Sequence, residues 1–183
     1  MPRIPYPTEE QLDPESRELM ANLPPLNLIR MFANAPAALG PVTDLGQAIL
    51  LKAELDPRLR EIAILAVARA CDSDYERLQH ENICRAIGME EEEIRAAADQ
   101  NPDQLDEEAR LVWTFADQIA RQVRADEDLT AEVLERFGRR QTTELVIACA
   151  YYSAMGRIIE TTGVELEETL PTENIDPDEY TEA

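Results

Sequence analysis

Helix-breaking residues are gathered near the ends of this chain, which limits the folds that it can adopt. Six of the twelve prolines lie in residues 1–27, and the whole chain has only six glycines. Proline fixes φ and lacks a backbone donor, so long regular structure is not expected in this N-terminal arm. Between the ends, apolar residues recur at helical spacing, and no alternating β-branched run predicts a strand. We therefore expect an all-α protein.

The helix signals divide the chain into an arm at residues 1–27, a helical domain at 28–163 and an acidic tail at 164–183. The tail carries eight acidic side chains and no basic one, so we expect it to be extended or mobile. Asp56 and Pro57 are typical of an N-cap and a first helical residue. The expected helices cover residues 14–23, 37–51, 58–70, 75–87, 89–98, 105–123, 129–137 and 141–162.

The composition excludes several classes of partner. With 183 residues, of which 44% are hydrophobic, the chain can bury one core. Seventeen basic against 38 acidic side chains give a net charge of -21, which repels nucleic acids and anionic membranes. No stretch reaches the ~20 apolar residues of a membrane span, and residues 1–5 lack the apolar region of a signal peptide. We expect a cytoplasmic protein that binds a small-molecule substrate.

The three cysteines do not form a recognisable framework. Cys71, Cys84 and Cys149 are odd in number and have no Cys-x-x-Cys spacing. This excludes a secreted disulfide scaffold and a cysteine-based zinc site. We interpret all three as small buried hydrophobic residues, and we expect no cofactor and no metal.

A weak internal repeat places one carboxylate near the start of each of the two most apolar helices, at Glu61 and at Glu144. A glutamate in a first turn complements the helix dipole, and we prefer that interpretation for Glu144.

His80 is the only histidine, so any proton transfer by imidazole must involve it. Glu76 lies one turn earlier, on the apolar side of the same expected helix. A buried carboxylate needs a partner, and His80 is the nearest candidate. The pair could be catalytic or purely structural. Glu61 lies nineteen residues before His80, and a simple helical hairpin need not bring these two together.

Two short runs resemble a known family. Residues 56–61 read Asp-Pro-Arg-Leu-Arg-Glu, and residues 75–80 read Tyr-Glu-Arg-Leu-Gln-His. Together with the helix that contains Tyr151 and Tyr152, they resemble the carboxymuconolactone decarboxylase family, which includes the alkyl hydroperoxidase D-like proteins. The resemblance covers about residues 25–165. It implies a cofactor-free helical bundle that forms homo-oligomers, commonly trimers or hexamers, with sites near subunit contacts.

The resemblance implies different activities in its two branches. The hydroperoxidase branch has a Glu, then Cys-x-x-Cys, then three residues and a His. Glu61 and His80 match that pattern, but Ser73 and Glu76 occupy the cysteine places. Neither side chain can reduce a peroxide, which requires a nucleophilic sulfur. Cys71, or Cys84 beside the imidazole, would have to substitute for the missing thiols.

The decarboxylase branch needs acid and base groups rather than thiols. By this resemblance, His80 is the acid, Glu76 orients it, Glu61 is a second carboxylate and Tyr75 a hydroxyl donor. Such an enzyme would act on a small carbonyl, lactone or carboxylate substrate.

Three alternatives stay open beside this acid–base enzyme. They are a hydroperoxide reductase, a non-catalytic helical oligomer, and a divalent cation bound by Glu61, Glu76 and His80. Arg58 and Arg60 could hold a substrate carboxylate, although arginines at a helix end are more often solvated.

Overall fold

The computed structural model describes residues 1–99 and 101–168. Within these residues the protein has eight α-helices, two short 3-10 helices and no strand, which confirms the all-α prediction. The α-helices are α1 (Pro14–Met20), α2 (Asn27–Phe32), α3 (Pro36–Leu51), α4 (Pro57–Ala70), α5 (Asp74–Ala86), α6 (Glu91–Ala98), α7 (Glu107–Gln122) and α8 (Glu127–Thr162). The 3-10 helices are η1 (Glu9–Gln11) and η2 (Pro102–Gln104).

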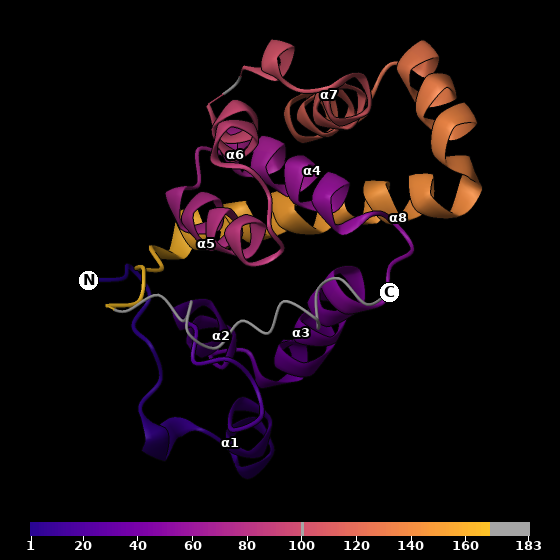
Figure 1. Ribbon diagram of the computed structural model, residues 1–183. Coiled ribbons are helices and arrows are strands. Elements are labelled where there is room, and N and C mark those ends of the chain that lie inside the picture. The colour runs from indigo at the N-terminus through magenta and orange to yellow at the C-terminus, as the bar shows by residue number, and fades with distance from the viewer. Residues whose placement is uncertain (100, 169–183) are drawn as a thin grey trace.

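The helices form two groups, visible one above the other in Figure 1. The N-terminal group contains α1, α2 and α3, with α3 packed against the other two. The larger group contains α5, α6, α7 and α8 arranged around α4, which contacts all four. Contacts of α3 with α8 join the groups.

The central helix α4 begins as its sequence predicts. The side chain of Asp56 accepts a hydrogen bond from the backbone N–H of Leu59 at 3.2 Å, and Pro57 is the first helical residue. Every residue from 59 to 68 is buried. A helix that is buried on all sides belongs to the interior of a bundle. Arg60 and Glu61 are consequently forced into the core, where each needs a partner.

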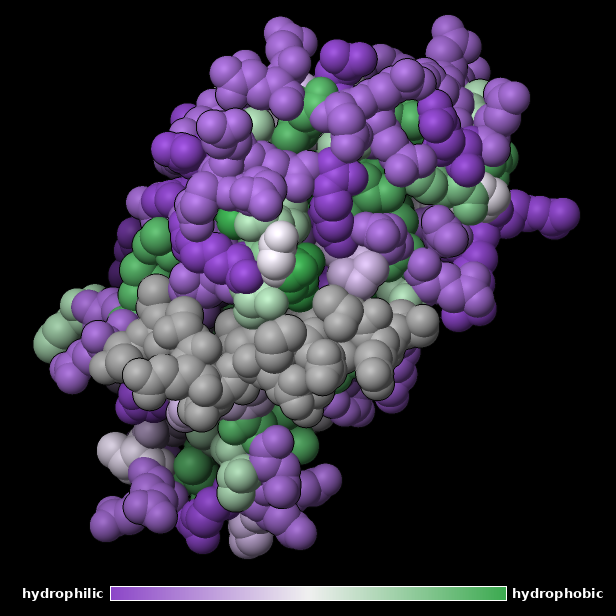
Figure 2. Space-filling view, in the orientation of Figure 1, coloured by the Kyte–Doolittle hydropathy of each residue, from purple (hydrophilic) through white to green (hydrophobic). Residues whose placement is uncertain are grey.

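An amphipathic helix, α7, covers one side of α4. Asp106 caps it by accepting from the backbone N–H of Ala109 at 2.8 Å. Val112 and Phe115 lie on its buried face, at the spacing that the sequence predicts. The opposite face is polar, and Figure 2 shows hydrophilic side chains gathered over α6 and α7 at the top of the view.

The last helix, α8, changes direction at a single glycine. Gly138 has φ 70° and ψ 175°, a conformation that is essentially restricted to glycine. The two helices expected at residues 129–137 and 141–162 therefore follow one another across this residue, and the turn is visible in Figure 1. The second part ends at Gly163, which adopts the left-handed conformation at φ 71°.

The sequence did not predict α2. Its six residues follow the proline-rich run, and Ile29, Met31 and Phe32 are buried. Six expected helices also start one or two residues away from the observed positions, since α3 to α8 begin at residues 36, 57, 74, 91, 107 and 127. Such shifts are common at helix ends.

The N-terminal arm is attached to the end of α8. The backbone N–H groups of Arg3 and Ile4 both donate to the carbonyl of Thr162, at 2.8 and 3.1 Å.

None of the helices in the described residues combines the length and apolarity needed to cross a membrane. The expectation for the acidic tail falls mostly on residues 169–183, which lie outside the described residues.

Candidate functional site

His80 lies between two carboxylates in the interior. Its Nδ1 is 2.6 Å from Oε2 of Glu61, and its Nε2 is 3.4 Å from Oε2 of Glu76. The exposed fractions of Glu61, Glu76 and His80 are 0%, 4% and 4%. The prediction that Glu76 lies on the buried side of its helix and faces His80 is confirmed.

Glu61 reaches His80 because α4 and α5 are packed neighbours. Glu61 lies nine residues before the end of α4, about 13.5 Å along the axis, and His80 lies six residues after the start of α5, about 9 Å. The difference of about 4.5 Å is within reach of the two side chains. Sequence spacing alone did not predict this contact, and the packing of the helices produces it.

Arg60 is the other partner of Glu61. Its Nε donates to Oε1 of Glu61 at 3.1 Å, and Arg60 is 1% exposed. The expectation of a solvated Arg60 is therefore wrong. Arg58, also considered for binding a substrate carboxylate, is instead ion-paired with Glu93 and Asp106.

The charges of this cluster stabilise one another. Burial alone lowers the pKa of His80, but the charge and hydrogen bond of Glu61, followed by those of Glu76, outweigh burial and raise it to about 9. Burial opposes ionisation of Glu61, and the neighbouring His80 and Arg60 overcome it and lower the pKa of that carboxyl group. At neutral pH the centre of the cluster is an imidazolium paired with a carboxylate.

A cavity of about 610 Å³ opens beside this cluster, between the end of the N-terminal arm, α2, α3, α5 and α8. Most of its lining is apolar, including Leu26, Phe32 and Met155, and both Glu76 and His80 form part of its wall. Oε1 of Glu76 is buried and has no hydrogen-bond partner. Because buried polar atoms are nearly always paired, this unpaired oxygen, on a side chain that lines the cavity, makes Glu76 a candidate for contact with a ligand.

Tyrosines of α8 complete the wall. The ring of Tyr152 meets that of His80 edge-on, with centroids 4.7 Å apart and an interplanar angle of 87°. The hydroxyl of Tyr151 donates to the carbonyl of Val42 at 3.0 Å. Burial raises the pKa of Tyr151 to about 12 and that of Tyr152 well above its usual value. In the sequence, the one sign of this contribution was that two tyrosines are adjacent in the most apolar expected helix.

Tyr75, the expected hydroxyl donor of the reaction, lines the same cavity. Its hydroxyl donates to Oε1 of Glu167 at 2.8 Å, in the segment that follows α8. Gln79, one turn further along α5, donates to Oε2 of the same carboxylate at 2.5 Å. Burial, followed by the nearby charge of Glu167, raises the pKa of Tyr75, so this phenol stays protonated. Sequence reasoning missed Gln79 and Glu167.

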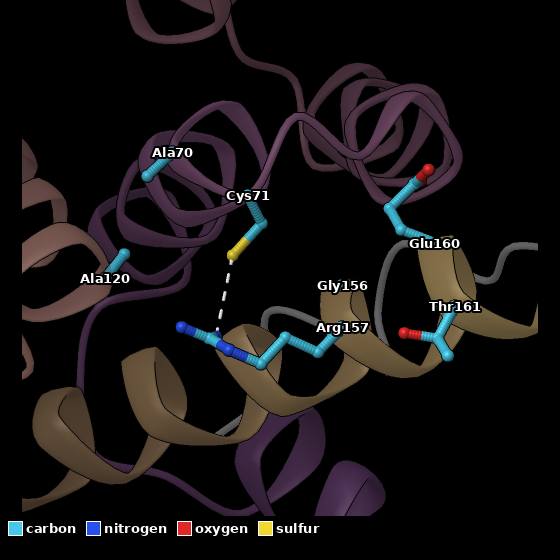
Figure 3. A pocket seen from close by; sticks show the side chains of 7 residues that line it. All are labelled: Ala70, Cys71, Ala120, Gly156, Arg157, Glu160 and Thr161. Carbon is cyan, nitrogen blue, oxygen red and sulfur yellow. Dashed lines mark hydrogen bonds between the residues drawn. The ribbon is translucent and has the colours of Figure 1, made fainter.

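The cysteines are all free thiols. Burial and then the charge of Glu61 raise the pKa of Cys84, so the imidazole does not favour its thiolate. Cys71 lies instead in a separate pocket of about 300 Å³, where its sulfur points toward Arg157, with Sγ and Nη1 3.9 Å apart (Figure 3). Burial raises the pKa of Cys71, and Arg157 only partly opposes that effect.

Glu61 and Glu76 face opposite nitrogens of the imidazole ring and do not converge on one point. In the described ranges, no group of three or more His, Cys, Asp and Glu side chains is arranged to hold a metal ion.

Glu144, the counterpart of Glu61 in the suggested repeat, is not at this site. Its Oε2 accepts from the backbone N–H of Leu55 at 3.0 Å, and its Oε1 accepts from Arg140 at 3.0 Å. This carboxylate joins α8 to the loop that precedes α4.

Comparison with known proteins agrees with this architecture. Residues 36–117 match the model of the carboxymuconolactone decarboxylase family. This segment runs from α3 into α7 and contains Glu61, Glu76 and His80.

A solved structure shares the fold over nearly the whole chain. It is described as an alkylhydroperoxidase AhpD core, an uncharacterized peroxidase-related protein from Ralstonia eutropha JMP134. The alignment has a TM-score of 0.78, covers 91% of this chain and 93% of that chain, and has 17% sequence identity. The predicted alkyl hydroperoxidase D-like helical fold is thereby confirmed. Comparison with curated proteins found no match.

Proposed function

We propose that this protein is a cofactor-independent enzyme that performs acid–base chemistry on a small carbonyl, lactone or carboxylate substrate. The observation that carries the proposal is the buried His80 between two carboxylates, where Glu76 and His80 both line the cavity and one oxygen of Glu76 has no hydrogen-bond partner. Perturbed titratable groups in a concave, mostly apolar pocket are typical of active sites. The cavity volume of about 610 Å³ suits a small molecule.

Each member of the cluster has a distinct role in this proposal. Arg60 and Glu61 hold the imidazole in place and keep it protonated from the side of Nδ1. Nε2 faces Glu76, whose Oε1 is free. A proton can pass from Nε2 to Oε2 of Glu76, while Oε1 exchanges a proton with a carbon or oxygen atom of the substrate. Glu76 is therefore the proposed group in contact with substrate.

Decarboxylation fits this arrangement. The C–C bond to the leaving carboxylate breaks, CO2 departs, and the electron pair stays on the substrate as a delocalised carbanion. The positive charge of His80 stabilises that developing negative charge, because electrostatic effects are strong in a site shielded from water. A proton delivered through Glu76 then completes the product at carbon.

The experiment is a carbon-acid assay in D2O. Purified protein is incubated with a panel of β-keto acids and unsaturated lactone acids, and NMR follows deuterium incorporation and CO2 release. The change Glu76→Gln or His80→Gln should lower the rate by about 10² to 10⁴. Glu81→Gln is the matched control, because Glu81 lies on the same helix but is ion-paired with Arg77 outside the cavity.

A variant with Ser at positions 71, 84 and 149 separates the alternatives. Full carbon-acid activity in this variant supports the proposal. Peroxide consumption by the unaltered protein that disappears in the variant would instead identify a hydroperoxide reductase acting through Cys71 or Cys84. If no substrate of the panel reacts and Glu76→Gln changes nothing, the site is structural, as in a non-catalytic oligomer.

A further inference from the structure

A carboxylate from the chain itself contacts two residues that line the cavity. Oε1 of Glu167 accepts from the hydroxyl of Tyr75 at 2.8 Å and from the backbone N–H of Asn27 at 2.6 Å. Oε2 accepts from the side-chain amide of Gln79 at 2.5 Å. Three neutral donors therefore converge on both oxygens of one carboxylate.

The donors are placed next to the proposed proton-transfer groups. Tyr75 and Gln79 lie one turn apart on α5, as do Glu76 and His80, so the two pairs form neighbouring rows on the same helix. All four side chains line the same cavity. A small acid held by Tyr75 and Gln79 would therefore have its remaining atoms beside Glu76.

The electrostatics of the cluster permit an additional anion here. Two cationic side chains, Arg60 and His80, lie beside two carboxylates, Glu61 and Glu76, so the formal charges of the cluster sum to zero. A further carboxylate here consequently meets hydrogen-bond donors rather than a net negative charge.

We infer that Tyr75, Gln79 and the backbone N–H of Asn27 form a binding site for the carboxylate group of the substrate, which Glu167 occupies in this structure. This inference rests on the proposed function and narrows it to carboxylate-bearing substrates. It gives Tyr75 a binding role in place of the hydroxyl donation to the reaction that the family resemblance implies. Glu167 is an internal competitor, and the segment after α8 must move its carboxylate away before a substrate binds.

Binding of a simple carboxylate tests the inference without any turnover. Isothermal titration calorimetry with propionate is performed on the full chain, and NMR follows the side-chain amide of Gln79. Glu167→Ala should bind propionate at least about tenfold more tightly than the unaltered protein, because a tethered carboxylate competes at millimolar effective concentration. Propionamide, which lacks the charge, should bind neither protein measurably.

Two further variants make the test specific. Glu165→Ala is the matched control, because Glu165 lies in the same segment but its side chain is ion-paired with the N-terminal amine. It should bind propionate as the unaltered protein does. Adding Gln79→Leu to Glu167→Ala should weaken propionate binding by at least about tenfold, since a hydrogen bond to a charged acceptor is lost. Glu167→Gln, which preserves the side-chain volume, replaces Glu167→Ala if the latter does not fold.

The inference is overturned if the Glu167 variants bind propionate no better than the unaltered protein, if propionamide binds equally well, or if Gln79→Leu has no effect. These outcomes are independent of the carbon-acid assay. Carboxylate binding without proton exchange would refute the proposed function alone. Proton exchange on carbonyl substrates without carboxylate binding would refute this inference alone.

Discussion

At the scale of single residues, the main finding is that one imidazole is controlled by two carboxylates with different tasks. Glu61 is fully buried, 2.6 Å from Nδ1, and is shared with Arg60. Glu76 is on the side of Nε2 and keeps one oxygen free. Burying an ion pair of this kind costs desolvation free energy that the attraction between the charges only partly offsets. Its presence is therefore better explained by a chemical role than by a gain in stability.

The pKa of His80 can be measured directly because it is the only histidine. We expect Glu61→Gln to lower that pKa from about 9 by at least about one unit, since the nearest negative charge is removed. The Hε1 resonance of His80 in a proton NMR titration reports the change. Glu81→Gln, with its carboxylate outside the cluster, is the control and should leave the titration unchanged. An unaltered His80 titration in Glu61→Gln would contradict the assigned pairing.

At the scale of elements, a close approach of α3 to α8 shapes the cavity. Gly46 of α3 faces the ring of Tyr151 on α8, and a Cβ atom at position 46 would lie 2.6 Å from the hydroxyl oxygen. The absence of a side chain at Gly46 allows Tyr151 to reach the carbonyl of Val42. Both Gly46 and Tyr151 line the cavity, so this contact sets part of its width.

Gly46→Ala should therefore displace the ring of Tyr151. We expect the free energy of unfolding to fall by about 1 to 3 kcal/mol, as for other overpacked sites, even though alanine favours a helix. Combining it with Tyr151→Phe removes the atom that clashes and should recover part of the loss, which urea denaturation of the four proteins of this double-mutant cycle would measure. Strictly additive effects of the two changes would refute the proposed contact.

At the scale of the whole molecule, the cluster should give stability a defined dependence on pH. The pKa of His80 is raised from 6.5 to about 9, so its stabilising contribution is complete below pH 6.5 and is lost as the pH rises through 9. We expect the free energy of unfolding to fall by on the order of 3 kcal/mol across that interval. The pKa of Glu61 is lowered, so its contribution is present above pH 4.5 and is lost as the pH falls below that value.

Urea titrations between pH 4 and 10 would show this profile, with a plateau between the two transitions. The variant His80→Gln is the control and should lack the decrease between pH 6.5 and 9. The pKa values of all three cysteines are also raised, so ionisation of the thiols in the unfolded chain adds a separate decrease above about pH 8.5, which His80→Gln keeps. An equally steep decrease in His80→Gln would assign it to another group.

The sequence predicted the all-α class, most helix positions and the pairing of Glu76 with His80. These features depend on local spacing, since helical periodicity, the cap at Asp56 and a turn of four residues are all read along one segment. Homo-oligomer formation, as trimers or hexamers, stays a prediction from the family resemblance.

The sequence by itself thus determined where most of the helices form and which side chains are available for chemistry, because backbone propensity and side-chain periodicity are local. Only the tertiary structure decided which of them meet. The contact of Glu61 with His80 depends on how α4 packs against α5. The hydrogen bonds from Tyr75 and Gln79 to Glu167 join residues about ninety positions apart in the sequence. Arg60 became a buried partner because α4 is enclosed on every side. Long-range packing, which has no signal in residue spacing, assembled the site.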